Sequence, residues 1–148
     1  MKIKQKGNTL IELLLATVIV GVMLTGVAIS LTYSIQREAL SRYREGATDL
    51  AEEISEYFLL RRAQQNWRGF YDNLSNSSYC YNPVNPPSIT AGATCAGISR
   101  LGMDFDSEIT ITKTGGPEKI SALITITWNV DGEDRTYELV QEYYEREF

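Results

Sequence analysis

Residues 8–36 read NTLIELLLATVIVGVMLTGVAISLTYSIQ, and no other part of the chain constrains its structure as strongly. Glu12 is the only charged residue in this stretch, and the run from Leu13 to Gln36 is uncharged over 24 residues. As an α-helix the run would be roughly 36 Å long, enough to cross a hydrocarbon layer about 30 Å thick. The sequence therefore predicts a single membrane-spanning helix over residues 8–36.

The residues that flank this stretch predict its orientation. Residues 1–7 read MKIKQKG and carry three lysines and no acid, whereas the sequence after residue 36 is acidic overall. Positive charge is retained on the cytoplasmic side of a membrane, so we expect the N-terminus inside and the rest of the chain outside. A cleavable secretory signal is the nearest alternative, but it would have a shorter apolar run followed by its small-residue site. Here the small residue, Gly7, precedes the run.

Composition narrows the classes of function. The chain has 148 residues, a net charge of -5, two cysteines and no histidine. Histidine is the most frequent general base and zinc ligand, and two cysteines cannot form a four-cysteine zinc site. An acidic chain also lacks the basic surface that displaces counterions from nucleic acid. The sequence thus predicts no enzyme activity and no metal or other cofactor, and it does not favour a nucleic-acid partner.

The helix is expected to continue beyond the membrane, to about residue 67. Apolar side chains recur there at spacings of three and four, the period of one helical face. This predicted buried stripe consists of Leu40, Tyr43, Ala47, Leu50, Ile54 and Tyr57. The other faces are mainly acidic and are expected to be solvated, with residues Glu38, Arg42, Glu45, Asp49, Glu52, Glu53 and Glu56. Gly46 is expected to weaken the helix locally by about 1 kcal/mol relative to alanine.

Residues 69–104 are interpreted as a variable, loop-rich segment. The runs NLSNSS, NPVNPP and AGATCAG are dense in turn-forming residues and show no steady periodicity. Cys80 and Cys95 lie in this segment, too far apart for a CxxC redox motif. Outside the cytoplasm the simplest prediction is a disulfide, which would close a loop of about 15 residues and stabilise the fold by roughly 3 kcal/mol. Free thiols are the alternative.

Residues 105–148 predict three antiparallel strands. Residues 107–113 and 120–130 alternate between apolar and polar side chains, and residues 135–144 return after a turn around Gly132. One face of the middle strand would be apolar: Ile120, Ala122, Ile124, Ile126, Trp128 and Val130. A long helix packed on such a sheet is an α+β fold.

Two short acidic runs are candidate calcium sites, namely Asp104–Glu108 and Asp131–Asp134. Neither has the spacing of a twelve-residue EF-hand loop, so both are interpreted as solvated turns.

The N-terminal motif resembles the class III signal of type IV pilins and type II secretion pseudopilins. The resemblance covers about the first 36 residues and rests on the basic leader, the residues from Gly7 to Glu12 (GNTLIE) and the apolar run that follows. It implies a pilin-like fold, a long N-terminal helix with an apolar first half on a small antiparallel sheet. The implied organisation is a leader 1–7, a transmembrane and assembly helix 8–36, and an extracytoplasmic domain 37–148.

The resemblance also implies processing and assembly. A prepilin peptidase would cut between Gly7 and Asn8, and the new amine of Asn8 would be N-methylated. Most members of the family have phenylalanine where this chain has Asn8. Glu12, one helical turn further, would pair with that amine on a neighbouring subunit and set the register of a filament, because an unpaired charge in lipid costs several kcal/mol.

The resulting prediction is a structural subunit, a minor pilin or pseudopilin, of a type IV pilus or a type II secretion-like filament. Its partners would be the peptidase, other subunits, the cytoplasmic membrane and, indirectly, an assembly platform and ATPase. After assembly it would lie in an extracellular or periplasmic filament.

Two alternatives remain open. One is a tip adhesin or DNA-uptake pilin that binds a ligand through its variable loop, with a local basic patch of Arg61, Arg62, Arg68 and Arg100. The other is an uncleaved, membrane-anchored surface protein that never polymerises.

Overall fold

The computed structural model describes residues 8–92, 95, 97–115 and 118–145. The chain divides into two compact units, Met1–Ser41 and Arg42–Phe148, which are described separately. Helix α1 (Asn8–Gln64) contributes to both units. The predicted leader, residues 1–7, lies outside the described residues.

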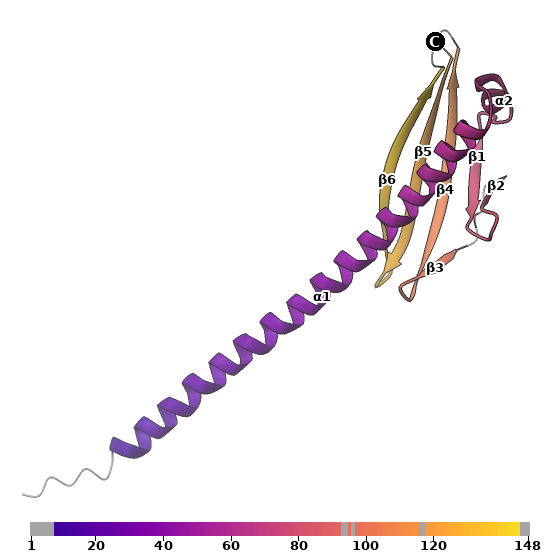
Figure 1. Ribbon diagram of the computed structural model, residues 1–148. Coiled ribbons are helices and arrows are strands. Elements are labelled where there is room, and N and C mark those ends of the chain that lie inside the picture. Colours follow the sequence, from indigo (N-terminus) through magenta and orange to yellow (C-terminus); the bar gives the residue numbers. More distant parts are fainter. Residues whose placement is uncertain (1–7, 93–94, 96, 116–117, 146–148) are drawn as a thin grey trace, which may run out of the picture. The chain divides into compact units, whose positions relative to one another are not determined.

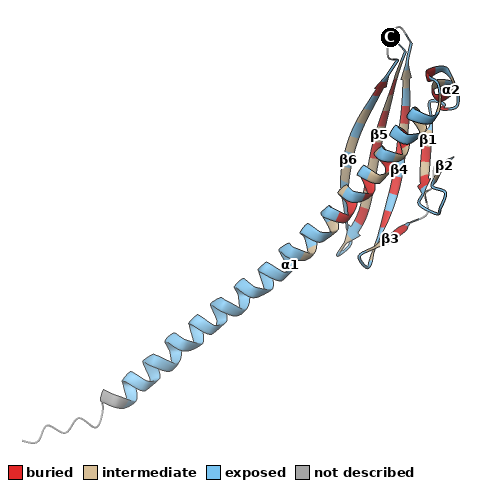
Figure 2. Cartoon of the chain, in the orientation of Figure 1, coloured by how far each residue is buried: buried red, intermediate tan, exposed pale blue. Residues whose placement is uncertain are grey.

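The N-terminal unit is the apolar part of α1, and every side chain described there between Leu10 and Glu38 is exposed (Figure 2). Leu13 is 69% exposed and Met23 is 66% exposed. Contact of such an apolar helix surface with water would be very unfavourable. Among the described residues, α1 is the one helix long and apolar enough to span a membrane. These properties indicate that the N-terminal helix anchors the chain in a membrane.

The second unit contains the rest of α1, a short helix α2 (Trp67–Asp72) and an antiparallel sheet of six strands. The sheet order is β2-β1-β4-β5-β6, and β3 pairs with β4 at one end (Figure 1). The strands are β1 (Ser78–Asn82), β2 (Ser88–Ala91), β3 (Ile98–Arg100), β4 (Met103–Thr114), β5 (Lys119–Val130) and β6 (Glu133–Tyr144). The predicted α+β, pilin-like architecture is confirmed: a long helix with an apolar first half is packed on an antiparallel sheet.

The core of this unit lies between α1 and one face of the sheet. The buried face of the helix consists of Ala47, Leu50, Ala51, Ile54 and Phe58. The strands contribute Phe105, Ile109, Ile111, Ile120, Ala122, Ile124, Ile126, Trp128 and Tyr143, among others. Ring contacts close the end near the C-terminus of α1, where Tyr143 lies 6.2 Å from Phe58 and 5.6 Å from Phe70 between ring centroids. This packing joins both helices to the edge strand β6.

The strand β5 has the predicted alternation. Its side chains from Ile120 to Trp128 on the inner face are buried, and Val130 is partly buried. The turn to β6 is the dipeptide Asp131-Gly132, and both residues have positive φ, 54° and 86°. Two positive φ values characterise the type I′ turn, whose twist matches that of a β-hairpin, and Asp-Gly is a preferred sequence for it.

Three strands were predicted, whereas the sheet has six. The first predicted strand was also expected to begin at residue 107, later than the observed start of β4. Strand β4 begins at Met103, and the segment 69–104 contains the end of α2 and three short strands. These strands are three to five residues long, and only β1 has buried side chains in alternation, Tyr79 and Tyr81. Such short elements carry too little periodicity to be distinguished from loops in a stretch rich in proline, asparagine and serine.

The predicted helical stripe was correct in its centre and wrong at its start. Leu40 is 42% exposed, because it belongs to the N-terminal unit, in which the described residues contain no strand. Phe58 and Ala51 are fully buried although they were not assigned to the stripe. At this end of the stripe the fully buried residue is therefore Phe58, and the predicted Tyr57 is only partly buried.

Gly46, predicted to be a weak point, instead allows a close approach between helix and sheet. A Cβ at this position would lie 3.2 Å from Leu101 Cδ1 and 3.3 Å from Phe105 Cζ. Both distances are tighter than ordinary van der Waals contact, so the missing side chain makes room for the phenylalanine ring of β4.

Candidate functional site

The predicted processing site lies at the beginning of the described chain. Gly7 falls outside the described residues, and Asn8 is the first residue of α1, with a side chain that is likewise outside the description. Cleavage between Gly7 and Asn8, and methylation of Asn8, therefore remain predictions.

Glu12 lies one turn into α1, on an exposed surface. It borders a shallow groove along one side of the helix, lined by Glu12, Leu13, Ala16, Thr17, Val20, Gly21 and Leu24. These positions recur at intervals of one, three and four residues and therefore form one face of the helix. Among the described residues Glu12 makes no ion pair, so its carboxylate is available for a group from another molecule.

Three threonine side chains of the apolar segment are satisfied within the helix. The hydroxyls of Thr17, Thr25 and Thr32 donate to backbone carbonyls three or four residues earlier, at 2.8 to 3.0 Å. In a bilayer a hydroxyl without such a partner would be costly, so these bonds suit a helix placed in lipid. Glu12 differs from these threonines, because no described group of the helix neutralises its charge.

The predicted disulfide between Cys80 and Cys95 is confirmed, and the two Cα atoms are 5.1 Å apart. Cys80 lies in β1, and Cys95 lies in the segment that leads to β3. The bond therefore holds the β1–β2 hairpin beside the end of the sheet where β3 pairs with β4.

The loop-rich segment 69–104 is also linked to α1, through contacts that were not predicted from the sequence. Glu53, assigned to the solvated face of the helix, accepts a hydrogen bond from the Tyr81 hydroxyl at 2.8 Å and forms an ion pair with Arg100. Burial, and then the hydrogen bond to Glu53, raise the pKa of Tyr81 well above its usual value of 10.0. The only sequence signal was the position of Glu53 at the border of the apolar stripe.

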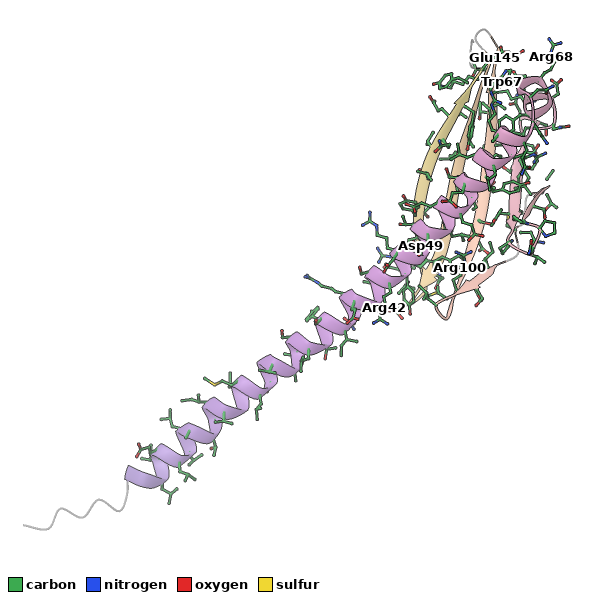
Figure 3. The ribbon with its side chains drawn as sticks, viewed as in Figure 1. Arg42, Asp49, Trp67, Arg68, Arg100 and Glu145 are labelled. Carbon is green, nitrogen blue, oxygen red and sulfur yellow. A yellow bond between two sulfur atoms is a disulfide. The ribbon has the colours of Figure 1, made fainter. Side chains whose placement is uncertain are left out.

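The four arginines proposed as a basic patch do not come together. Arg68 lies on α2 beside Trp67, whereas Arg100 lies at the opposite end of the sheet, on β3 (Figure 3). Arg100 is neutralised by Glu53, and Arg62 stacks on Trp67 with its guanidinium carbon 5.0 Å from the ring centroid. The arrangement gives no single surface on which these four charges would act together.

The acidic runs also differ from their interpretation as turns. Asp104, Asp106 and Glu108 lie in β4 and alternate with buried Phe105 and Ser107, so their side chains share the exposed face of the strand. In the second run only Asp131 and Gly132 form the turn, because Glu133 already begins β6. Within the described ranges, no three Cys, Asp or Glu side chains are placed to hold a metal ion.

The N-terminus matches a family model. Residues 2–28 match the prokaryotic N-terminal methylation motif, the class III signal of type IV pilin-like proteins. The match includes Gly7, Asn8 and all the residues that line the helical groove, from Glu12 to Leu24. No curated protein and no solved structure matches the chain.

Proposed function

We propose that this chain, which carries the N-terminal methylation motif of type IV pilin-like proteins, is a minor pilin or pseudopilin. A prepilin peptidase would remove residues 1–7, and the new N-terminus at Asn8 would be methylated. The subunit would be stored in the cytoplasmic membrane and then assembled, by a platform and its ATPase, into a pilus or a secretion filament. The single observation that carries the proposal is the match of residues 2–28 to the motif, a range that includes most of the exposed apolar segment of α1.

Assembly is proposed to depend on the groove that contains Glu12. Its carboxylate makes no ion pair among the described residues, and the face beside it has small side chains at Ala16 and Gly21. No atom outside the helix backbone lies within 4 Å of a Cβ placed on Gly21, so another helix is free to pack there. Close packing of small residues is a main source of helix association in membranes. In a filament, Glu12 would neutralise the amine of Asn8 on an adjacent subunit.

Processing is tested by the intact mass of the full chain, extracted from membranes after coexpression with an active prepilin peptidase. The expected product lacks Met1–Gly7 and carries one added methyl group. Gly7→Val is the matched negative variant, because a β-branched side chain would prevent the close backbone approach that cleavage needs. A full-length mass for the natural sequence, beside a cleaved control substrate, would contradict the proposal and favour a permanent membrane anchor.

Assembly is tested separately from processing by Glu12→Gln. This variant keeps the shape of the side chain and removes its charge, so it should be cleaved normally and should remain in the membrane fraction. We expect it to be lost from sheared filaments, because the neighbouring amine would have no counter-charge in lipid. Glu38→Gln, also on α1 but outside the groove, is the control. Equal recovery of both variants in filaments would contradict the proposed role of Glu12.

A further inference from the structure

We propose that the open edge of β6, together with the hollow beside it, docks an extended basic segment of a partner protein as an additional strand. The proposal concerns the second unit alone and does not depend on the role in filaments. It rests on four observations: the position of the hollow, a buried acceptor that has no partner among the described residues, the unpaired edge, and the charge of the strand.

The hollow has a volume of about 690 Å³ and lies between the end of α1 and the end of β6. One wall consists of Leu59, Arg62, Ala63 and Gln65, and the other consists of Gln141, Glu142, Tyr143 and Tyr144. Side chains of consecutive strand residues point to opposite faces of a sheet. Because four consecutive residues of β6 line the hollow, it must open against the backbone edge of the strand and not against one face.

One buried polar atom of the residues in this wall, Gln65 Oε1, makes no hydrogen bond among the described residues. A buried polar group without a partner costs about 1–3 kcal/mol, so this oxygen is a candidate to bond an incoming ligand. An amide oxygen accepts, which suits a backbone N–H of an extended peptide.

The edge itself is unusually open. Strand β6 has 12 residues, pairs along its whole length with β5, and pairs with no other strand in the described part of the chain. Figure 1 shows it, in gold, as the outermost strand of the sheet. The backbone groups on its free side are a template for another extended segment.

Charge identifies the kind of segment that fits. Strand β6 contains four acidic residues and one arginine, so a second copy would be repelled, which excludes self-pairing as the favoured mode. On the outer face, Glu138 is followed two residues later by Val140, which is 58% exposed. Glu142, two residues further, is already bonded to Lys119 at 2.5 Å. A matching strand would therefore place a lysine or arginine opposite Glu138 and an apolar residue opposite Val140.

The test uses the full chain in nonionic detergent micelles and a fluorescein-labelled peptide, TKTVTKTVT, followed by fluorescence anisotropy. Two further peptides carry N-methyl groups, one on the odd residues and the other on the even residues. Because alternate amides of a strand point to opposite edges, one methylated peptide should lose binding and the other should keep it. Binding of both, or of neither, would overturn strand addition, and empty micelles control for uptake by detergent.

Variants of the protein test the assigned residues. Glu138→Lys should weaken binding of the unmethylated peptide by at least about five-fold, whereas Asp49→Lys, an equal charge change on α1, should not. Gln65→Met removes the unpaired amide oxygen at similar side-chain length and should weaken binding by about two- to ten-fold without loss of folding. Near-ultraviolet circular dichroism checks that each variant is folded. Unchanged affinity of Glu138→Lys and Gln65→Met would overturn the proposal, whatever the outcome for cleavage at Gly7.

Discussion

The Glu53 carboxylate accepts a hydrogen bond from the Tyr81 hydroxyl at 2.8 Å. Glu53 lies on α1 and Tyr81 on β1, the strand next to the short edge strand β2. The second oxygen of the same carboxylate pairs with Arg100 on β3. One acidic side chain thereby joins the helix to two of the short strands, in a region that has few buried residues of its own. The disulfide stabilises the same region, because it joins Cys80, the neighbour of Tyr81 in β1, to Cys95.

Replacement of Glu53 by alanine is expected to lower the free energy of unfolding by about 1–3 kcal/mol. Tyr81 is 4% exposed, so its hydroxyl would lose its acceptor in a buried site. The ion pair with Arg100 should contribute little of this loss, because both side chains are partly exposed, at 28% and 37%. The measurement is thermal unfolding in micelles, followed by near-ultraviolet circular dichroism. Glu52→Ala, an exposed neighbour on α1, should change stability by less than about 0.5 kcal/mol.

Removal of the disulfide should cost about 3 kcal/mol. The bond closes a loop with a sequence separation of 15, and the entropy that it removes from the unfolded chain gives this magnitude. The Cys80→Ser, Cys95→Ser double variant should therefore unfold at lower temperature than the natural protein. Addition of a reductant to the natural protein should produce the same shift and none in the double variant. A reductant effect on the double variant would show that the loss has another source.

Gly46 offers a test of packing between helix and sheet. Gly46→Leu should destabilise the second unit by about 1–3 kcal/mol, because the new side chain meets the buried ring of Phe105. Gly46→Ala should be much milder. Its Cβ would lie 3.2 Å from Leu101 Cδ1 and 3.3 Å from Phe105 Cζ, so Leu101, which is 67% exposed, and the Phe105 ring need to shift by only a few tenths of an ångström. Alanine also restores up to about 1 kcal/mol of helix propensity. Chemical denaturation of the two variants measures the free energy of unfolding. If Gly46 only weakened the helix and made no close contact, both substitutions would stabilise the protein.

The elements predicted well from the sequence are those with long, regular patterns. The apolar run after Glu12 and the alternation from Ile120 to Trp128 each contain enough repeats to fix the type of element and its buried face. The Gly7–Glu12 motif was equally specific, since its spacing of small, polar, apolar and acidic residues precedes an uncharged span.

What the sequence could not reveal depends on contacts between distant segments. Glu53 is one of several acids on its helix, and only the folded chain places it beside Tyr81 and Arg100. The open edge of β6 was equally hidden, because alternation predicts a strand but not its place in the sheet order. Strand order depends on which strands pair across the sheet. Here β1 pairs with β4, and the paired residues are far apart in the sequence, 32 residues at Ser78↔Thr110 and 28 residues at Cys80↔Glu108.

Alkaline pH provides the last test, through the buried tyrosines. Burial raises the pKa of both Tyr81 and Tyr143 above the ordinary value of 10.0. Such a group binds its proton more tightly in the folded than in the unfolded state. Its contribution to stability is therefore fully present below pH 10.0 and is lost as the pH rises towards the folded pKa.

The natural protein should accordingly lose stability above pH 10.0, and Tyr81→Phe should lose less of it, because phenylalanine does not ionise. At neutral pH the variant starts lower, since it lacks the hydrogen bond to Glu53. The difference in unfolding temperature between the two proteins should hence shrink as the pH is raised, and absorbance of tyrosinate should show ionisation of Tyr81 only with unfolding. A difference that stays constant with pH would mean that the Tyr81 hydroxyl titrates in the folded state as it does in the unfolded chain.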